Sequence, residues 1–381
     1  MTPNDTAGPA SPPDAARPAP EPARVREAPT LGFEDLTRGL LWPMIFRAPA
    51  LALRPARVGF ALITIVLLAL VGSISRLWSD TNYADRLADA FAGLVGEWLS
   101  ILFLGGGGRS GPGPVEVVFS HPVSSIVLGV PMLAILAVGA GAISRSAARE
   151  FALNERDPWP RSLAFAAGRG VSFFFTLAIP ILFVLAIYLT IAVAGFLLLT
   201  LPGVSIVGAV LFALALAAGL LAAVATLAGL LALPIFLAAM ACEGADAIDA
   251  VQRAYAYAIA RPIRLVVYIA IAELLGLVFI GVVALVTSLG VSFSLDAASA
   301  FGGRPLPNPD AGALWSASGA IVEFWIKLAV LLVGAIALSY LASAGVIVYL
   351  LIRRVVDGQH HQDLWSPPAP SAIKGDGAPS A

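Results

Sequence analysis

The residue most able to do chemistry is an acid inside an apolar run. Glu273 lies eight residues into the run Leu265–Ser292, about 12 Å deep at the helical rise of about 1.5 Å per residue. Such a charge is costly in hydrocarbon and marks a candidate functional site. Pro180 and Pro234 reach a similar depth in two other runs, and Pro180 removes the backbone hydrogen bond at Thr176. These four residues predict a polar cavity for a cation, a proton or a lipid headgroup. The alternative is a neutral Glu273 hydrogen-bonded between helices, with two ordinary helix kinks.

A second group of charged residues has helical spacing. Glu243, Asp246 and Asp249 recur every three residues, and Arg253 follows Asp249 by four, so the four share one helix face. This face is a candidate docking surface for a protein partner. The alternative is structural, because acids at the start of a helix interact favourably with its dipole.

The remaining reactive residues predict no catalytic centre. Glu323 and Lys327 are four apart and predict a helical ion pair, either structural or part of a substrate gate. A single cysteine, Cys242, excludes an internal disulfide. Together with that cysteine, the three histidines form no metal-ligand spacing: His121, His360 and His361. We therefore expect no catalytic residues, no metal and no cofactor.

The composition indicates the elements that must position these residues. Hydrophobic residues make up 59% of the 381, charged residues only 12%, and the mean hydropathy is +0.89. Soluble domains carry about 25% charged residues. Six apolar runs exceed or approach the roughly 20 residues that cross a bilayer. They are 58–78, 123–143, 171–201, 204–241, 265–292 and 328–352.

The predicted fold is an all-α polytopic helical membrane protein. Its six transmembrane helices form three hairpins within residues 58–358, with cytoplasmic interfacial helices before the first, third and fifth. Residues 1–30 are rich in Pro and Ala and predict a disordered tail, as do residues 359–381. Residues 31–57 mix apolar and basic side chains and suit the membrane surface. The run 204–241 is rich in small residues, which predicts the most buried helix.

The basic residues predict the orientation. Eighteen of the 23 Lys and Arg residues fall on the side of the termini and four on the other, with Lys327 at the start of the sixth helix. Basic residues stay in the cytoplasm during insertion, so both termini are predicted to be cytoplasmic. Only two of the 23 are Lys, which with the many Ala and Pro residues favours a GC-rich bacterial genome and hence the inner membrane.

Each odd-numbered helix follows a similar junction. These junctions are Arg54-Pro55-Ala56-Arg57, Arg169-Gly170 and Arg261-Pro262. One hypothesis is a threefold repeat of a surface helix, a break and a hairpin. The other is that basic junctions recur wherever a chain enters from the positive side.

One of these junctions also carries a resemblance. The stretch Asp246–Pro262 has an acidic start, an Arg-Ala-Tyr core and an Arg-Pro end. It resembles the juxtamembrane motif of a family of uncharacterised bacterial inner-membrane proteins with six helices, and residues 141–155 and 349–357 resemble two further segments of that family. A more distant similarity is to the membrane domain of some glycerophosphodiester phosphodiesterases, whose catalytic barrel has no counterpart here. The resemblance covers roughly residues 40–360 and implies topology without an activity.

The sequence contains no motif that identifies a reaction. It has no basic stripe, so nucleic acid is not an expected partner. The expected partners are the lipid bilayer and a membrane or cytoplasmic protein. The favoured function is a scaffold or assembly component, and a small-molecule or lipid transporter with a cavity near Glu273 is the alternative. A membrane enzyme ranks third.

Overall fold

A computed structural model describes residues 41–90, 92–93, 111–200, 204–300 and 313–365. The chain divides into two units, 1–41 and 42–381, and the features below belong to the second unit. The expected disorder of residues 1–30 concerns residues outside the described ranges. Within those ranges the secondary structure is helical and contains no strand.

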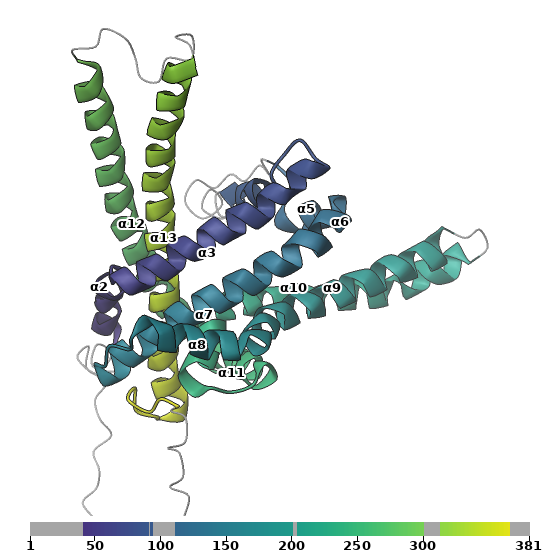
Figure 1. Ribbon diagram of the computed structural model, residues 1–381. Coiled ribbons are helices and arrows are strands. Elements are labelled where there is room, and N and C mark those ends of the chain that lie inside the picture. The colour runs from purple at the N-terminus through teal and green to yellow at the C-terminus, as the bar shows by residue number, and fades with distance from the viewer. Residues whose placement is uncertain (1–40, 91, 94–110, 201–203, 301–312, 366–381) are drawn as a thin grey trace, which may run out of the picture. The chain divides into compact units, whose positions relative to one another are not determined.

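Six helices in the described ranges are long and apolar enough to cross a membrane. Neighbours in sequence pack as three hairpins, α3 with α7, α9 with α10 and α12 with α13 (Figure 1). The protein is therefore an all-α, multi-pass membrane protein, which confirms the predicted fold class. In the first hairpin, one arm is α3 (Pro55–Ser73) with η2 (Ile74–Leu77), and the other is α6 (Pro122–Ser124), η3 (Ser125–Gly129) and α7 (Val130–Leu153). The second hairpin consists of α9 (Gly170–Leu199) and α10 (Ser205–Glu243). The third consists of α12 (Pro262–Ser299) and α13 (Ala313–Asp357).

Several helices run beyond their apolar cores. The helix α13 has 45 residues and begins at Ala313 instead of 328, because the charged pair Glu323 and Lys327 is compatible with an exposed helical turn. The helix α7 continues past 143 to Leu153, because its polar last turns find partners on other helices. Hydropathy alone locates the apolar core of a helix and misses these polar extensions.

A short helix precedes each hairpin, as the sequence predicts. These helices are η1 (Trp42–Arg47) with α2 (Ala48–Ala52), α8 (Trp159–Gly168) and α11 (Ala247–Ala260). The residue that caps the next spanning helix is an arginine in all three cases: Arg54, Arg169 and Arg261. A proline follows Arg54 and Arg261, at a position where a helix has no backbone hydrogen bond to lose.

The second helix of each hairpin also ends in the same way. A residue with positive φ follows or closes the helix: Asn154 at 55°, Gly244 at 59° and Gly358 at 70°. This left-handed conformation ends helices by satisfying their last carbonyl groups. The three hairpins thus share one order of parts.

The core lies at one end of the hairpins, which we call the packed end. Here α3, α9 and α12 begin, and the buried residues cluster in the last turns of α7, α10 and α13. The most apolar stretch of α7 is 39% buried, whereas those of α9 and α10 are 0% and 6% buried. The prediction that the run 204–241 is the most buried helix is therefore wrong. Its small residues permit close packing with α9, but outside the last turns most residues of α10 remain exposed or half-buried.

One glycine sets the crossing of α10 and α13. A Cβ atom at Gly345 would lie 2.1 Å from the carbonyl oxygen of Pro234. Only glycine permits this approach of the two backbones, in line with the use of small residues between membrane helices.

The segment after α3 folds against the first hairpin. Residues 83–90 are helical, and Tyr83 packs with Val117 of α5 (Pro114–Ser120) and with Leu128. The Tyr83 hydroxyl also donates to Ser125 Oγ at 2.8 Å. These contacts lie at the opposite end of α3 and α7 from the packed end.

Candidate functional site

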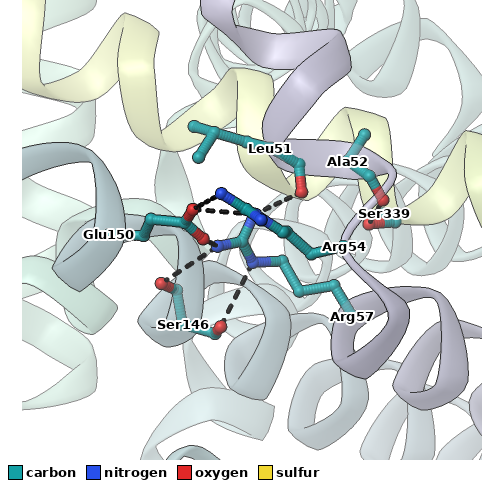
Figure 2. A network of polar contacts seen from close by, with 7 residues as sticks. All are labelled: Leu51, Ala52, Arg54, Arg57, Ser146, Glu150 and Ser339. Carbon is teal, nitrogen blue, oxygen red and sulfur yellow. Dashed lines mark hydrogen bonds and ion pairs between the residues drawn. The ribbon is translucent and has the colours of Figure 1, made fainter. Parts of the chain in front are cut away.

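The most buried charge at the packed end is Arg57, with 1% of its surface exposed. It lies in the first turn of α3, and its guanidinium forms an ion pair with Glu150 of α7 (Figure 2). Its Nε donates to Ser146 Oγ at 3.1 Å, and another nitrogen donates to the carbonyl oxygen of Leu51. From the edge of the site, Arg54 Nε donates to Glu150 Oε1 at 2.8 Å. All three nitrogens of the Arg57 guanidinium group therefore donate to an acceptor, as a buried charge requires.

The third hairpin also contacts the site around Arg57. Ser339 of α13 donates to the carbonyl oxygen of Ala52, the last residue of α2, at 2.8 Å (Figure 2). The network of α2, α3, α7 and α13 thus joins the first hairpin to the last.

A second network surrounds Glu243, the last residue of α10. Its carboxylate forms an ion pair with Arg253 of α11 and lies 3.6 Å from an Arg353 nitrogen of α13. The Tyr349 hydroxyl donates to the same carboxylate. One turn further along α11 from Arg253, the Tyr257 hydroxyl donates a hydrogen bond to Asp357. Burial raises the pKa of the Tyr257 hydroxyl. This network joins the second hairpin to the third.

A third network joins α7, α8 and α10 to the chain beyond α13. Arg145 donates to the carbonyl oxygens of Ala241 at 2.8 Å and Trp365 at 2.9 Å. The backbone N–H of Trp365 donates to the Cys242 carbonyl oxygen at 2.9 Å, and Arg169 donates to Gly244. Residues 359–365 therefore differ from the predicted disordered tail, because the Cys242 carbonyl oxygen and the side chains of Arg145 and Arg353 hold them. The rest of that tail, 366–381, lies outside the described residues.

These networks bind helices to one another and offer little reactive surface. The carboxylates of Glu150, Glu243 and Asp357 each accept from cations or a tyrosine. The Cys242 thiol is buried. Within the described residues no three His, Cys, Asp or Glu side chains gather as metal ligands.

The residues of the predicted cavity have different surroundings. Thr176 is buried, donates to the Ser172 carbonyl oxygen at 2.8 Å and lies 3.4 Å from the Met240 sulfur. Pro180 and Pro234 are half-buried in α9 and α10. Glu273 is exposed on α12, and no hydrogen bond or ion pair links it to the other three among the described residues.

The predicted docking face is partly exposed. Asp246 and Asp249 are exposed at the start of α11, whereas the Glu243 carboxylate is half-buried and pairs with Arg253. Arg253 therefore pairs with Glu243 rather than with Asp249. Asp246 also borders an open, largely apolar pocket of about 300 Å³ between the starts of α9 and α11.

The predicted pair between Glu323 and Lys327 is confirmed. Their side chains meet at 2.7 Å and both are exposed. Exposed pairs contribute about 0–1 kcal/mol, so this one is of minor importance for stability.

Sequence reasoning missed the residues that organise the packed end. It used Arg145, Arg169 and Arg353 as markers of orientation, of a helix junction or of a family resemblance, assigned them no contacts, and did not consider Trp365. One available signal was the placement of arginine and glutamate inside or beside predicted spans, where a charge needs a partner.

No protein-family model, curated protein or solved structure matches this chain.

Proposed function

We propose that the protein is a scaffold or assembly component of the bacterial inner membrane. The packed end would lie at the cytoplasmic surface with both termini. The three hairpins would reach from it through the bilayer.

The observation that carries this proposal is the use of the buried charges. Arg57 joins α3 to α7, Arg353 joins α13 to α10, and Arg145 joins α7 to α10. Each contact fixes one helix against another. A rigid hub with apolar hairpins exposed around it suits a protein whose role is to hold other molecules in the membrane.

The distribution of charge supports the orientation. Eighteen of 23 Lys and Arg residues belong to the segments of the packed end and the termini. The positive-inside rule assigns such a side to the cytoplasm.

The exposed acids Asp246 and Asp249 are the docking site in this proposal. They precede and begin α11, whose other face is buried against its neighbours through residues such as Ala250 and Ala254. A rigidly mounted acidic edge beside an apolar pocket fits a basic, partly apolar segment of a partner protein.

Site-specific photo-crosslinking in a bacterium that produces the full chain tests this proposal. A benzophenone amino acid at position 249 is expected to give a discrete protein adduct, and one at position 246 the same adduct. Asp296, an exposed acid near the far end of α12, provides the matched control position and is expected to give none. Adducts of equal identity and yield at 249 and 296 would contradict the proposal.

A transporter is the second candidate, supported by Glu273. The residue lies within a membrane-crossing helix and is exposed there, with no ion pair to another described residue. Acids inside spans usually serve a substrate or proton pathway. A bound lipid or small molecule that depends on Glu273 is what this candidate requires.

A further inference from the structure

Two arginines at the packed end have no carboxylate partner. Arg145 is 3% exposed and Arg169 caps α9, and no acid of the described residues forms an ion pair with either. Their hydrogen bonds go to backbone carbonyl oxygens of Ala241, Gly244 and Trp365. Arg145 is buried and Arg169 is half-buried. Asp157 acts on Arg145 electrostatically, but no carboxylate of the described residues lies within ion-pair distance of either arginine. Buried charges are normally paired, so this pair of neighbouring cations is an unusual feature.

Two aromatic rings lie beside both guanidinium groups. The Arg145 and Arg169 guanidinium carbons lie 4.5 and 5.4 Å from the centre of the Phe165 ring. They lie 5.9 and 4.6 Å from the centre of the Trp365 indole. The two cations therefore face one common space, which the indole occupies.

The indole belongs to a segment that we call the C-terminal strap, residues 358–365, the yellow loop after α13 in Figure 1. Arg353 donates to the strap carbonyl oxygens of His360 and Asp363, yet its own buried Nε has no hydrogen-bond partner. The strap thus presents neutral carbonyl oxygens to arginines that prefer oxyanions. An oxyanion acceptor would add the attraction of opposite charges to these hydrogen bonds, and this attraction is stronger away from bulk water.

The strap is more exposed than the helix ends on which it lies. None of its residues is buried, and Gln362 and Asp363 are exposed. Segments with few buried contacts open locally at a small cost in free energy. Opening would remove Trp365 from between the arginines while α7, α8 and α10 stay packed.

We propose that Arg145 and Arg169 form a binding site for a phosphate monoester and that the C-terminal strap is its removable cover. The planar, fork-like donors of two guanidinium groups match phosphate oxygens. The site lies where Arg169 meets Gly170, the first residue of a membrane-crossing helix, which is the level of a phospholipid headgroup. A headgroup phosphate and a soluble phosphate present the same chemistry to it.

Titration of the full chain in phosphatidylcholine nanodiscs with phosphatidic acid, read by native mass spectrometry, tests the site. Trp365→Ala is expected to bind phosphatidic acid about tenfold more tightly than wild type. Without the indole, a larger fraction of the molecules has the space between Arg145 and Arg169 open to a ligand. In the Trp365→Ala background, Arg169→Gln is expected to return binding to the wild-type level, and Arg169→Lys to lose only part of the gain. Trp159→Ala, at an exposed tryptophan of α8, is the matched control and is expected to bind as wild type does.

Competition then identifies the source of the phosphate. Displacement of phosphatidic acid by millimolar inorganic phosphate supports a soluble phosphate ligand, and retention supports a lipid headgroup. Binding by Trp365→Ala that is no tighter than that of wild type, or that survives Arg169→Gln unchanged, overturns the proposal. Far-ultraviolet circular dichroism and thermal unfolding of each variant verify that the helical fold is retained.

Discussion

Arg57 at the start of α3 and Glu150 near the end of α7 form a buried ion pair across 93 residues of sequence. It links the two helices of the first hairpin at the packed end. Because Arg54, Ser146 and Leu51 complete its hydrogen bonds, the pair holds one defined geometry.

Arg57→Gln is expected to destabilise the protein by about 3–5 kcal/mol, because it leaves the Glu150 carboxylate buried with only a partly exposed partner. Arg54→Gln is the matched control, since the Arg54 side chain is 42% exposed, and a loss of about 0–1 kcal/mol is expected. Chemical denaturation in detergent, followed by circular dichroism, measures both. Equal losses of stability in the two variants would contradict the expectation that the buried Arg57 contributes more to stability than the partly exposed Arg54.

Gly345→Ala is expected to destabilise the packing of α10 on α13 by about 1–3 kcal/mol, because the new methyl group overlaps the Pro234 carbonyl oxygen. Gly219→Ala in α10 is the control. A Cβ atom there meets no neighbour, so the gain in helix propensity is expected to leave stability equal or slightly higher. Thermal unfolding of the two variants provides the comparison, and the same melting temperature for both would contradict the close crossing.

The C-terminal strap is expected to loosen as the pH falls below about 6.5, the ordinary pKa of histidine. Burial lowers the pKa of His361, and the positive groups His360, Arg354 and Arg47 lower it further, while Asp363 opposes them. The undocked strap therefore takes up a proton at higher pH than the docked strap. Docking is unaffected above the ordinary pKa and weakens progressively as the pH falls through it.

Hydrogen exchange of residues 358–365, corrected for intrinsic rates, measures this loosening at pH 7.5 and 5.5. His361→Gln removes the titrating group and is expected to reduce the difference between the two pH values. A wild-type strap that is equally protected at both pH values would refute the prediction.

The apolar runs predicted the six spanning helices because length and hydropathy are local properties. The same is true of the arginine junctions, where Pro55 and Pro262 start α3 and α12. The order of short helix, junction and hairpin followed directly from these signals.

The partners of the charged residues were not readable from local spacing. Arg253 pairs with Glu243 and not with Asp249, because α10 ends beside α11 and supplies a closer carboxylate. Likewise, Trp365 contacts Cys242 and Arg145, which lie 123 and 220 positions earlier in the sequence. Such contacts depend on how the three hairpins pack, which no periodic pattern encodes.

Native mass spectrometry of the full chain in mild detergent tests the scaffold proposal most directly. A stoichiometric protein partner is expected to remain bound in Glu273→Gln and to be lost in the double variant Asp246→Asn, Asp249→Asn. A lipid or metabolite that is bound in place of a protein and is lost in Glu273→Gln would contradict the scaffold proposal and favour a transporter.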